Sequence, residues 1–250
     1  MRKLFVDFPI TPQIPFMLTA ADSHHILQVL RTPRGTRLTV TDSTGSTYEA
    51  IVSTVDKGLA VMEPGIQPVQ TTVRVVFGRV YLAAGLLKSD KFEWILQKAT
   101  EIGADGIIPV QMTNCVVKFN QSRWDEKKKR WTRIILEAAK QCGRTQVPEL
   151  FPLSTINNLT VDFSEMLFIV PYENEQHQEL WQERKRFCQG DVLILIGPEG
   201  GFTPLEIESI KDKLGEQCCI VSLGHNILRA ETAALTALSI IEYERGFSEK

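Results

Sequence analysis

The chain has 250 residues, of which 43% are hydrophobic, and a formal net charge of −2, so it can bury a substantial core and is not expected to be disordered. No apolar run reaches the roughly 18 residues that a membrane span needs, and the amino-terminal segment lacks a signal-peptide core, so we expect a cytoplasmic protein with no membrane partner. The five cysteines are odd in number and none has C-x-x-C spacing, which predicts neither a disulfide framework nor a metal site.

The first 70 residues are typical of a small β domain. Arg37–Asp42 and Thr47–Val55 alternate between polar and apolar residues on either side of the turn signal Thr44-Gly45, which predicts a hairpin. Lys3–Phe8 and Leu59–Met62 are two further candidate strands.

One short helix, His24–Leu30, is expected inside this β domain, with Asp22 as its N-cap. It is followed by Arg31 and Arg34, two cations at a corner that could contact RNA, although the domain carries as many acidic as basic side chains. The segment Glu63–Thr72 contains two prolines and a glycine and is predicted to link this domain to the next.

From Val73 onward, apolar strand patterns alternate with helix patterns. The expected strands are Val73–Ala83, Gly106–Met112, Glu165–Val170, Asp191–Ile196 and Cys218–Leu223, and the expected helices are Asp90–Ile102, Ser122–Cys142, His177–Phe187, Pro204–Leu214 and Arg229–Arg245. Asp90 and Thr203 are the predicted N-caps of two helices, with Glu93 and Glu206 completing capping boxes. Strands that alternate with helices without hairpin turns predict an α/β domain whose parallel sheet is covered by helices on both faces.

Positive charge is concentrated between Cys115 and Thr145, where basic residues exceed acidic ones by six. The long helix in this region has one apolar stripe, which consists of Trp124, Trp131, Ile135, Ala138 and Cys142, and its other faces carry the cations. Such a surface can attract a polyanion, and the alternative is an ordinary solvated helix face.

Three predicted strand ends carry distinctive residues, and ligands bind to parallel sheets at the carboxyl ends of strands. These ends are Pro171-Tyr172-Glu173, Gly197-Pro198-Glu199-Gly200-Gly201, and Leu223 to Arg229. A Walker A loop is excluded because Phe202 and Thr203 stand where glycine and lysine are needed, and there is no G-x-G-x-x-G. The glycine run therefore either makes room for a ligand or forms a plain strand-to-helix turn with positive φ at Gly200 or Gly201.

The glycine run, together with Leu223-Gly224-x-x-Ile227-Leu228-Arg229-Ala230-Glu231-Thr232-Ala233, resembles the RsmE-type methyltransferases, which methylate N3 of a uridine in small-subunit (16S) ribosomal RNA. Other blocks are similar to that family as well, namely Lys88-Ser89-Asp90-Lys91, Gln97 to Gly103, Glu137 to Arg144, and Val29-Leu30-Arg31 with Gly35. The resemblance extends over nearly the whole chain. Asn226 stands where the family usually has a basic residue, and Ser89 replaces a common glycine.

This resemblance implies a SPOUT-type domain with a carboxyl-terminal trefoil knot over residues 73–250 and a PUA-like β-barrel over residues 1–70. It also implies a homodimer that acts on 16S ribosomal RNA in the small ribosomal subunit. The three strand ends would hold S-adenosylmethionine, through Val170, Pro171, Tyr172, Glu173, Ile196, Gly197, Pro198, Glu199, Gly200, Gly201, Leu223, Gly224, Asn226, Ile227 and Leu228. RNA contacts are expected from Arg31, Arg34, Lys88, Lys118, Arg123 and Lys127.

Uridine N3 must lose its imide proton before it can attack a methyl group, which requires a general base or a cation that stabilises the uracil anion. Arg229 and Arg144 are the candidate cations, and Glu231 joins them as a candidate catalytic carboxylate, with Glu173 and Glu199 as alternatives. Two other functions stay open: a noncatalytic RNA-binding factor in ribosome assembly, and a knotted methyltransferase that acts on transfer RNA or on another position of ribosomal RNA.

Overall fold

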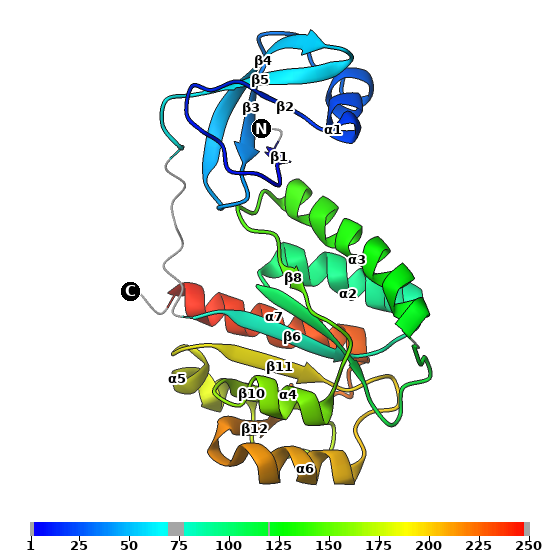
Figure 1. Cartoon of the computed structure of the whole chain (residues 1–250). Helices are drawn as coiled ribbons and strands as arrows, with labels where there is room; N and C mark the ends of the chain where they lie inside the picture. Colours follow the sequence, from blue (N-terminus) through cyan, green and yellow to red (C-terminus); the bar gives the residue numbers. More distant parts are fainter. Residues whose placement is uncertain (1–2, 70–77, 120, 248–250) are drawn as a thin grey trace. The chain divides into compact units, whose positions relative to one another are not determined.

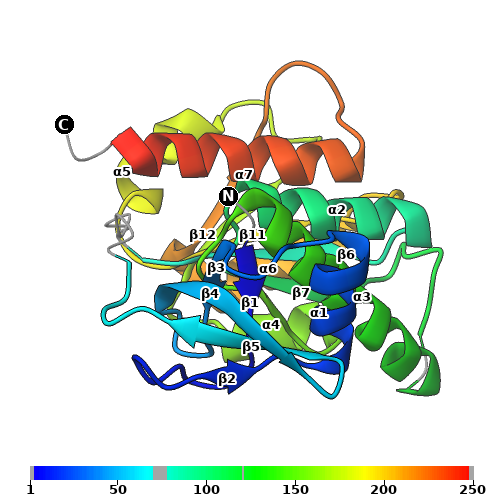
Figure 2. The ribbon, with the colours of Figure 1, turned by 90° about the horizontal axis from the view of Figure 1, so that it is seen from above.

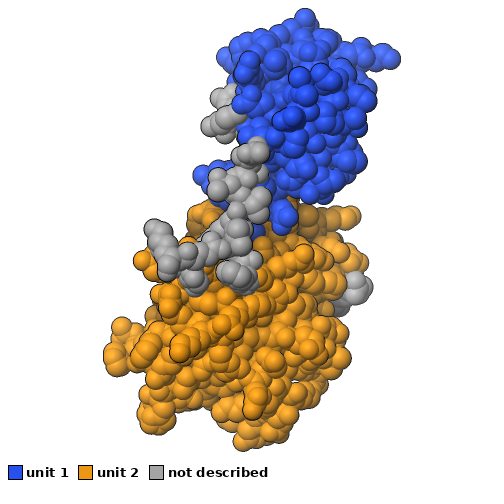
Figure 3. Space-filling view, turned by 90° about the vertical axis from the view of Figure 1, so that its left-hand side faces the viewer, with its two compact units in different colours: residues 1–73, 140–146 blue, residues 74–139, 147–250 orange. Residues whose placement is uncertain are grey.

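The computed structural model describes residues 3–69, 78–119 and 121–247 (Figure 1). The chain divides into two compact units, of which unit 1 comprises Met1–Val73 and Lys140–Gln146, and unit 2 comprises Arg74–Ala139 and Val147–Lys250 (Figure 3). Residues 70–72 of the predicted linker and residues 73–77 of the first predicted strand of the α/β domain lie outside the described residues.

Unit 1 is built on a five-stranded sheet with the strand order β1-β3-β4-β5-β2. The strands are β1 (Lys3–Phe5), β2 (Phe16–Met17), β3 (Arg37–Thr41), β4 (Thr47–Asp56) and β5 (Leu59–Pro64). Strands β3 and β4 pair antiparallel around Gly45, whose φ is 84°, so the predicted hairpin is confirmed. Leu38, Val40, Ala50 and Val52 alternate along the hairpin and are buried, as a one-sided sheet requires.

The helix of unit 1 starts earlier than the sequence predicted. Helix α1 (Ala20–His24) continues as a single π-helical turn, His25–Val29. Its N-cap is Thr19, whose hydroxyl oxygen accepts a hydrogen bond from the Asp22 amide at 3.1 Å. The prediction of Asp22 as the N-cap was wrong because Thr19 is extended and ends the preceding segment, which places Asp22 inside the first turn.

Unit 2 contains a parallel sheet, and all strand pairs described in it run parallel. The strand order is β12-β10-β11-β6-β7-β8, with β9 also paired to β7. The strands are β6 (Val80–Gly85), β7 (Gly106–Gln111), β8 (Glu149–Leu150), β9 (Ser154–Thr155), β10 (Leu167–Pro171), β11 (Val192–Ile196) and β12 (Cys218–Val221). Every residue of β6 and β11 is buried, as expected for central strands covered on both faces.

Helices cover both faces of this sheet, which confirms the predicted α/β class. They are α2 (Ser89–Ile102), α3 (Gln121–Cys142), α4 (Ile156–Asp162), the 3₁₀ turn η2 (Leu180–Glu183), α5 (Arg184–Phe187), α6 (Pro204–Leu214), the 3₁₀ turn η3 (Gly215–Gln217) and α7 (Ala230–Phe247). Helices α2 and α7 pack together on one face, and α4 and α6 pack together on the other (Figures 1 and 2). No helix in the part of the chain that the structure describes is long and apolar enough to cross a membrane.

Two helix starts show where local sequence signals succeed and fail. Helix α6 begins as predicted, with Thr203 as its N-cap and Glu206 completing the capping box. At α2 the predicted capping box does not form, because the N-cap is Lys88 and makes no side-chain cap hydrogen bond. Glu93 instead accepts a hydrogen bond from Arg130 of α3 at 2.6 Å.

Two further helix predictions need correction. The predicted helix His177–Phe187 is helical only from Leu180, as η2 followed by α5. On α3, the predicted apolar stripe is buried at Trp124, Trp131, Ile135 and Ala138, but Cys142 at its end is exposed. The indole of Trp131 stacks on the Phe92 ring with centroids 4.4 Å apart, which fixes α3 against α2.

Candidate functional site

A pocket of about 420 Å³ lies at the carboxyl ends of β10 and β12, within the size range of small-molecule sites. Residues on both sides of it were predicted from the sequence, namely Pro171, Tyr172, Glu173, Leu223, Gly224, Asn226, Ile227 and Leu228. Sequence reasoning missed Glu175, Gln176, Glu179, Ser222, His225 and Ala233, which also line it. The structure therefore joins two of the three predicted strand ends in one cavity.

The loop after β12 is shaped by its own backbone and by Ser222. The Ser222 hydroxyl accepts a hydrogen bond from the Gly224 amide at 3.2 Å and donates one to the Gly224 carbonyl at 3.1 Å. Gly224 has a φ of 119°, a conformation that side chains strongly disfavour. In this loop the Ile227 side chain is 83% exposed, so the pocket has an apolar surface that a ligand can contact.

The opposite wall of the pocket, residues 172–179, is a turn held by side-chain to backbone bonds. The Glu175 carboxylate accepts hydrogen bonds from the amides of His177 at 2.8 Å and Gln178 at 3.1 Å. These bonds, led by the one from His177, hold the pKa of Glu175 below its usual value despite partial burial. The wall joins β12 through the Ser222 amide, which donates to the Gln178 carbonyl at 2.7 Å.

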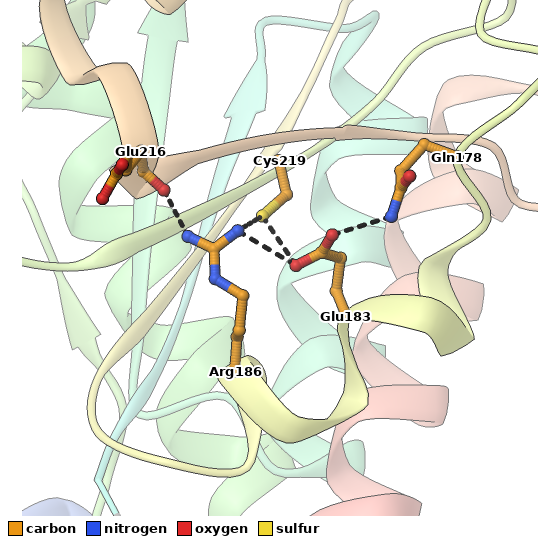
Figure 4. A network of polar contacts seen from close by, with 5 residues as sticks. All are labelled: Gln178, Glu183, Arg186, Glu216 and Cys219. Carbon is orange, nitrogen blue, oxygen red and sulfur yellow. Dashed lines mark hydrogen bonds and ion pairs between the residues drawn. The ribbon is translucent and has the colours of Figure 1, made fainter.

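A network of polar side chains also connects this wall to β12, through Glu183, which bonds to Gln178 of the wall and to Cys219 of β12 (Figure 4). The Glu183 carboxylate accepts hydrogen bonds from Gln178 at 2.8 Å, from Arg186 at 3.0 Å and from the Cys219 thiol at 3.2 Å. Arg186 also donates to the Glu216 carbonyl. Burial and the neighbouring Glu183 carboxylate raise the pKa of Cys219 to about 12, so this thiol is a structural donor and not a nucleophile.

The glycine turn Gly197–Gly201, the third predicted strand end, contributes no residue to the lining of this pocket, and two of its glycines are packed too closely for a side chain. A Cβ atom on Gly200 would lie 2.9 Å from the Cβ of Asn114, whose side-chain amide donates to the Gly200 and Gly201 carbonyls at 3.1 and 3.2 Å. Gly201 has a φ of 68°, which confirms the predicted positive φ, and a Cβ there would lie 2.5 Å from a Glu173 carboxylate oxygen. The turn therefore supports Glu173, a pocket residue, from behind.

The strand residues predicted beside these loops lie in the core. Val170 and Ile196 are buried within β10 and β11 and position the loops that follow them. Gly197 and Pro198 are also buried, and Pro198 lies directly against Gly85 at the end of β6.

A second group of predicted residues gathers at the start of α7. Arg229 is exposed, and its carbonyl accepts the first helical hydrogen bond, from Ala233, at 2.8 Å. Glu231 and Glu199 both face the ammonium group of Lys91, at 3.7 and 2.9 Å. Lys91 was missed as a site residue, although it belongs to one of the sequence blocks that carry the family resemblance. Among the described residues, no group of three or more His, Cys, Asp or Glu side chains could hold a metal ion.

A family model described as an RNA methyltransferase domain matches residues 76–242. The ribosomal RNA small subunit methyltransferase E of Bacillus subtilis is 34% identical to this chain over 258 residues, covering 98% of this chain and 97% of that protein. This chain belongs to the ribosomal RNA small subunit methyltransferase E family. The resemblance found in the sequence is thereby confirmed.

Solved structures of similar proteins agree with this assignment. The ribosomal RNA small subunit methyltransferase E of Neisseria gonorrhoeae, bound to S-adenosyl methionine, aligns with a TM-score of 0.84 and 26% identity over 97% of both chains. A putative methyltransferase of Legionella pneumophila, in complex with the cofactor SAM, aligns with a TM-score of 0.84 and 27% identity over 96% of both chains.

For this methyltransferase family member, the predicted RNA-binding cations occupy different environments. Arg31, Arg34, Lys88, Lys118 and Arg123 are exposed. Lys127 is less accessible and lies 3.7 Å from the Glu93 carboxylate. Arg144 belongs to unit 1, and its guanidinium donates to the Gln146 carbonyl at 3.2 Å. The roles assigned to these residues stay predictions.

Proposed function

We propose that this protein is an S-adenosylmethionine-dependent methyltransferase that methylates N3 of a uridine in 16S ribosomal RNA, in the cytoplasm. The observation that carries the proposal is the pocket between the β10 and β12 ends, in a chain that matches family members over nearly its full length. Bound S-adenosylmethionine would supply an electrophilic methyl group on a positively charged sulfur.

The pocket residues fit such a cofactor. Backbone groups of Leu223–Leu228 can bond to an adenine edge, while Tyr172 and Leu228 offer apolar surface to its faces. Glu173 and Glu179 line the same cavity, and their carboxylates suit ribose hydroxyls and a ligand with a positive sulfonium and an ammonium group. After methyl transfer the sulfur is neutral, so this acidic lining favours the donor over the product.

Arg229 is the residue best placed for the reaction at N3. Its side chain is exposed at the end of the pocket loop, where an RNA base can reach it. A guanidinium there stabilises the uracil anion as the imide proton leaves. Glu231 is less suited to accept that proton in this conformation, because its Oε2 atom is buried and has no hydrogen-bond partner among the described residues. Arg144 is proposed to bind a phosphate group or the uracil base of the RNA.

The proposal includes a SPOUT-type trefoil knot and an amino-terminal PUA-like barrel. The path of unit 2 supports the knot, because the chain leaves the edge strand β12 and returns through α7 to pack on β6 and β11 in the middle of the sheet. The five-stranded sheet of unit 1 supports the barrel, with Arg31 and Arg34 exposed beside it as RNA contacts. An experimental structure that traces residues 190–235 would test the knot.

We also propose a homodimer. The large apolar side chains that unit 2 exposes include Trp181 at 66%, Ile227 at 83% and Tyr243 at 63%, which a second copy of the chain could cover. Sedimentation of the purified protein at micromolar concentration tests this, with a monomer as the contradicting result.

The test of the activity uses small ribosomal subunits from a strain that lacks the enzyme. We expect label from S-adenosylmethionine to enter 16S ribosomal RNA, and mapping of the modified nucleotide to place the methyl group on uridine N3. Label at another position or in transfer RNA would identify a related methyltransferase instead. No transfer, together with no binding of S-adenosylmethionine by calorimetry, would indicate a noncatalytic RNA-binding factor.

A further inference from the structure

Lys91 connects three segments that are far apart in the sequence. Its ammonium nitrogen lies 2.9 Å from Oε1 of Glu199 in the glycine turn and 3.7 Å from Oε1 of Glu231 in the first turn of α7. Lys91 itself is the third residue of α2. One cation therefore joins the start of α2, the glycine turn and the start of α7.

Lys91 lies where a positive charge is unfavourable unless nearby carboxylates neutralise it. The amino-terminal end of a helix carries a partial positive charge, which disfavours lysine in the first turn. The hydrogen bond to Glu199 raises the pKa of Lys91, against partial burial and the positive charge of Arg229. The side chains of Lys91, Glu199 and Glu231 are 30%, 23% and 14% exposed, so Glu231 is the most enclosed of the three, whereas water reaches the hydrogen bond between Lys91 and Glu199.

Both carboxylates are close in the chain to the pocket lining, although the glycine turn itself contributes no lining residue. Two residues after Glu199, Gly201 packs against the side chain of Glu173, which lines the pocket. Two residues after Glu231, Ala233 lines the pocket from α7. Lys91 therefore holds two sides of the pocket together from outside, without lining the pocket itself.

Glu231 depends on this cation. Its second oxygen, Oε2, is buried and has no hydrogen-bond partner among the described residues. A mostly buried carboxylate is costly without a nearby opposite charge. Without Lys91, Glu231 and Glu199 would be left as like charges, and the start of α7, which includes Arg229 at its boundary, would no longer be fixed to the glycine turn.

We propose that Lys91 is a positioning residue for the methyl-transfer reaction, which holds the glycine turn and the start of α7 in register so that the cofactor pocket and Arg229 keep their geometry. This inference rests on the proposed function. It assigns to Lys91 a role through Glu199 and Glu231, and no direct contact with cofactor or RNA.

The first test compares Lys91→Met with a matched control on the same helix. Lys98 forms an ion pair with Glu101 at 2.8 Å, and these side chains are 34% and 26% exposed, close to the values of the Lys91 pair. We expect Lys91→Met to weaken S-adenosylmethionine binding about fivefold to tenfold by calorimetry and to lower kcat, while Lys98→Met leaves both unchanged. Lys91→Arg should restore most of the affinity, because the charge is kept. Equal affinities for Lys91→Met and Lys98→Met would overturn the inference.

The second test is a double-mutant cycle between Lys91→Met and Glu199→Gln. If the two side chains act through each other, the double variant binds S-adenosylmethionine about as weakly as the Lys91 variant alone. Additive losses would show independent effects and refute the link. A wild-type protein that binds no S-adenosylmethionine would contradict the proposed function itself, so the two failures are distinguishable.

Discussion

The glycine turn Gly197–Gly201 and the loop Ser222–Leu228 both follow buried strands of one parallel sheet, yet their glycines serve different purposes. In the turn, a Cβ on Gly200 would clash with Asn114, and one on Gly201 would meet Glu173. In the loop, a Cβ on Gly224 would have no neighbour within 4 Å, and Ile227 is almost fully exposed. The turn is tightly packed against neighbouring residues and supports the fold, whereas the loop is open and lines the pocket.

This difference shows that glycine content alone does not identify a ligand loop. The turn needs glycine because neighbouring backbone and side chains leave no room, and the loop needs Gly224 because of its φ of 119°. We expect changes at the loop to reduce activity without loss of stability, and changes around the turn to reduce stability first. The predictions below test this division, starting from the largest expected effect.

Arg229→Ala, at the end of the open loop, should lower the rate of methyl transfer about 100-fold, the order of effect seen when a donor to a developing anion is removed. Stability should not change, because the Arg229 side chain is exposed. Single-turnover transfer to small ribosomal subunits measures the rate, and urea unfolding measures stability. Lys211→Ala on α6 is the surface control. Wild-type turnover in Arg229→Ala would remove this residue from the mechanism.

Gly85→Ala tests the tight packing of the turn. An added Cβ would lie 2.6 Å from the backbone nitrogen of Pro198, in the glycine turn, and backbone cannot move aside as a side chain can. We expect the free energy of unfolding to fall by about 1–3 kcal/mol, as for overpacked cores. Gly65→Ala is the control, because its Cβ would meet the Glu49 carbonyl at an ordinary 3.4 Å. Equal stability of the two variants would mean that the turn is looser than the structure indicates.

The structural elements that were predicted correctly are those whose formation depends on residues close together in the sequence. Helix α6 begins at Pro204 as predicted because Thr203 and Glu206 satisfy each other within one turn. The parallel sheet followed from apolar runs, since a central strand must be buried on both faces. Leu223, Gly224, Asn226, Ile227 and Leu228 were correctly expected at a pocket because they follow one of these strands.

The features that were not predicted correctly depend on hydrogen bonds between residues that are far apart in the sequence. The capping box at α2 failed because Glu93 bonds to Arg130 on another helix. The pocket wall at Glu175 and Glu179 was missed because its position depends on backbone bonds to Ser222, more than 40 residues later. A run of polar residues directly after the buried strand β10 was the available signal for that wall.

Glu206→Gln should lower the free energy of unfolding by about 1 kcal/mol at pH 7, as for loss of a helix cap. Burial alone would raise the pKa of Glu206, but hydrogen bonds from Thr113 and Thr203 outweigh it and lower the pKa below 4.5. The stabilisation is therefore present above pH 4.5 and is lost as the pH falls through the lowered, folded-state pKa. Urea unfolding of both proteins between pH 7 and pH 3 should show the difference shrinking. A difference that grows on acidification would contradict the sign of this pKa shift.

Glu183→Gln tests whether the open loop depends on the network behind the pocket wall. The substitution keeps the shape and an oxygen acceptor for Gln178 but removes the ion pair with Arg186, whose side chain is 43% exposed. Because water partly screens such a pair, we expect only about a threefold loss of S-adenosylmethionine affinity.

Arg184→Gln is the matched control for Glu183→Gln, since Arg184 is the next residue, the first of α5, and pairs with Glu244 of α7 and not with the wall. If affinity falls in the Glu183 variant alone, the wall needs both its backbone bonds to Ser222 and this charged anchor to shape the pocket. If affinity is unchanged while stability drops, the backbone bonds to Ser222 suffice, and the Glu183–Arg186–Cys219 network, like the glycine turn, supports the fold.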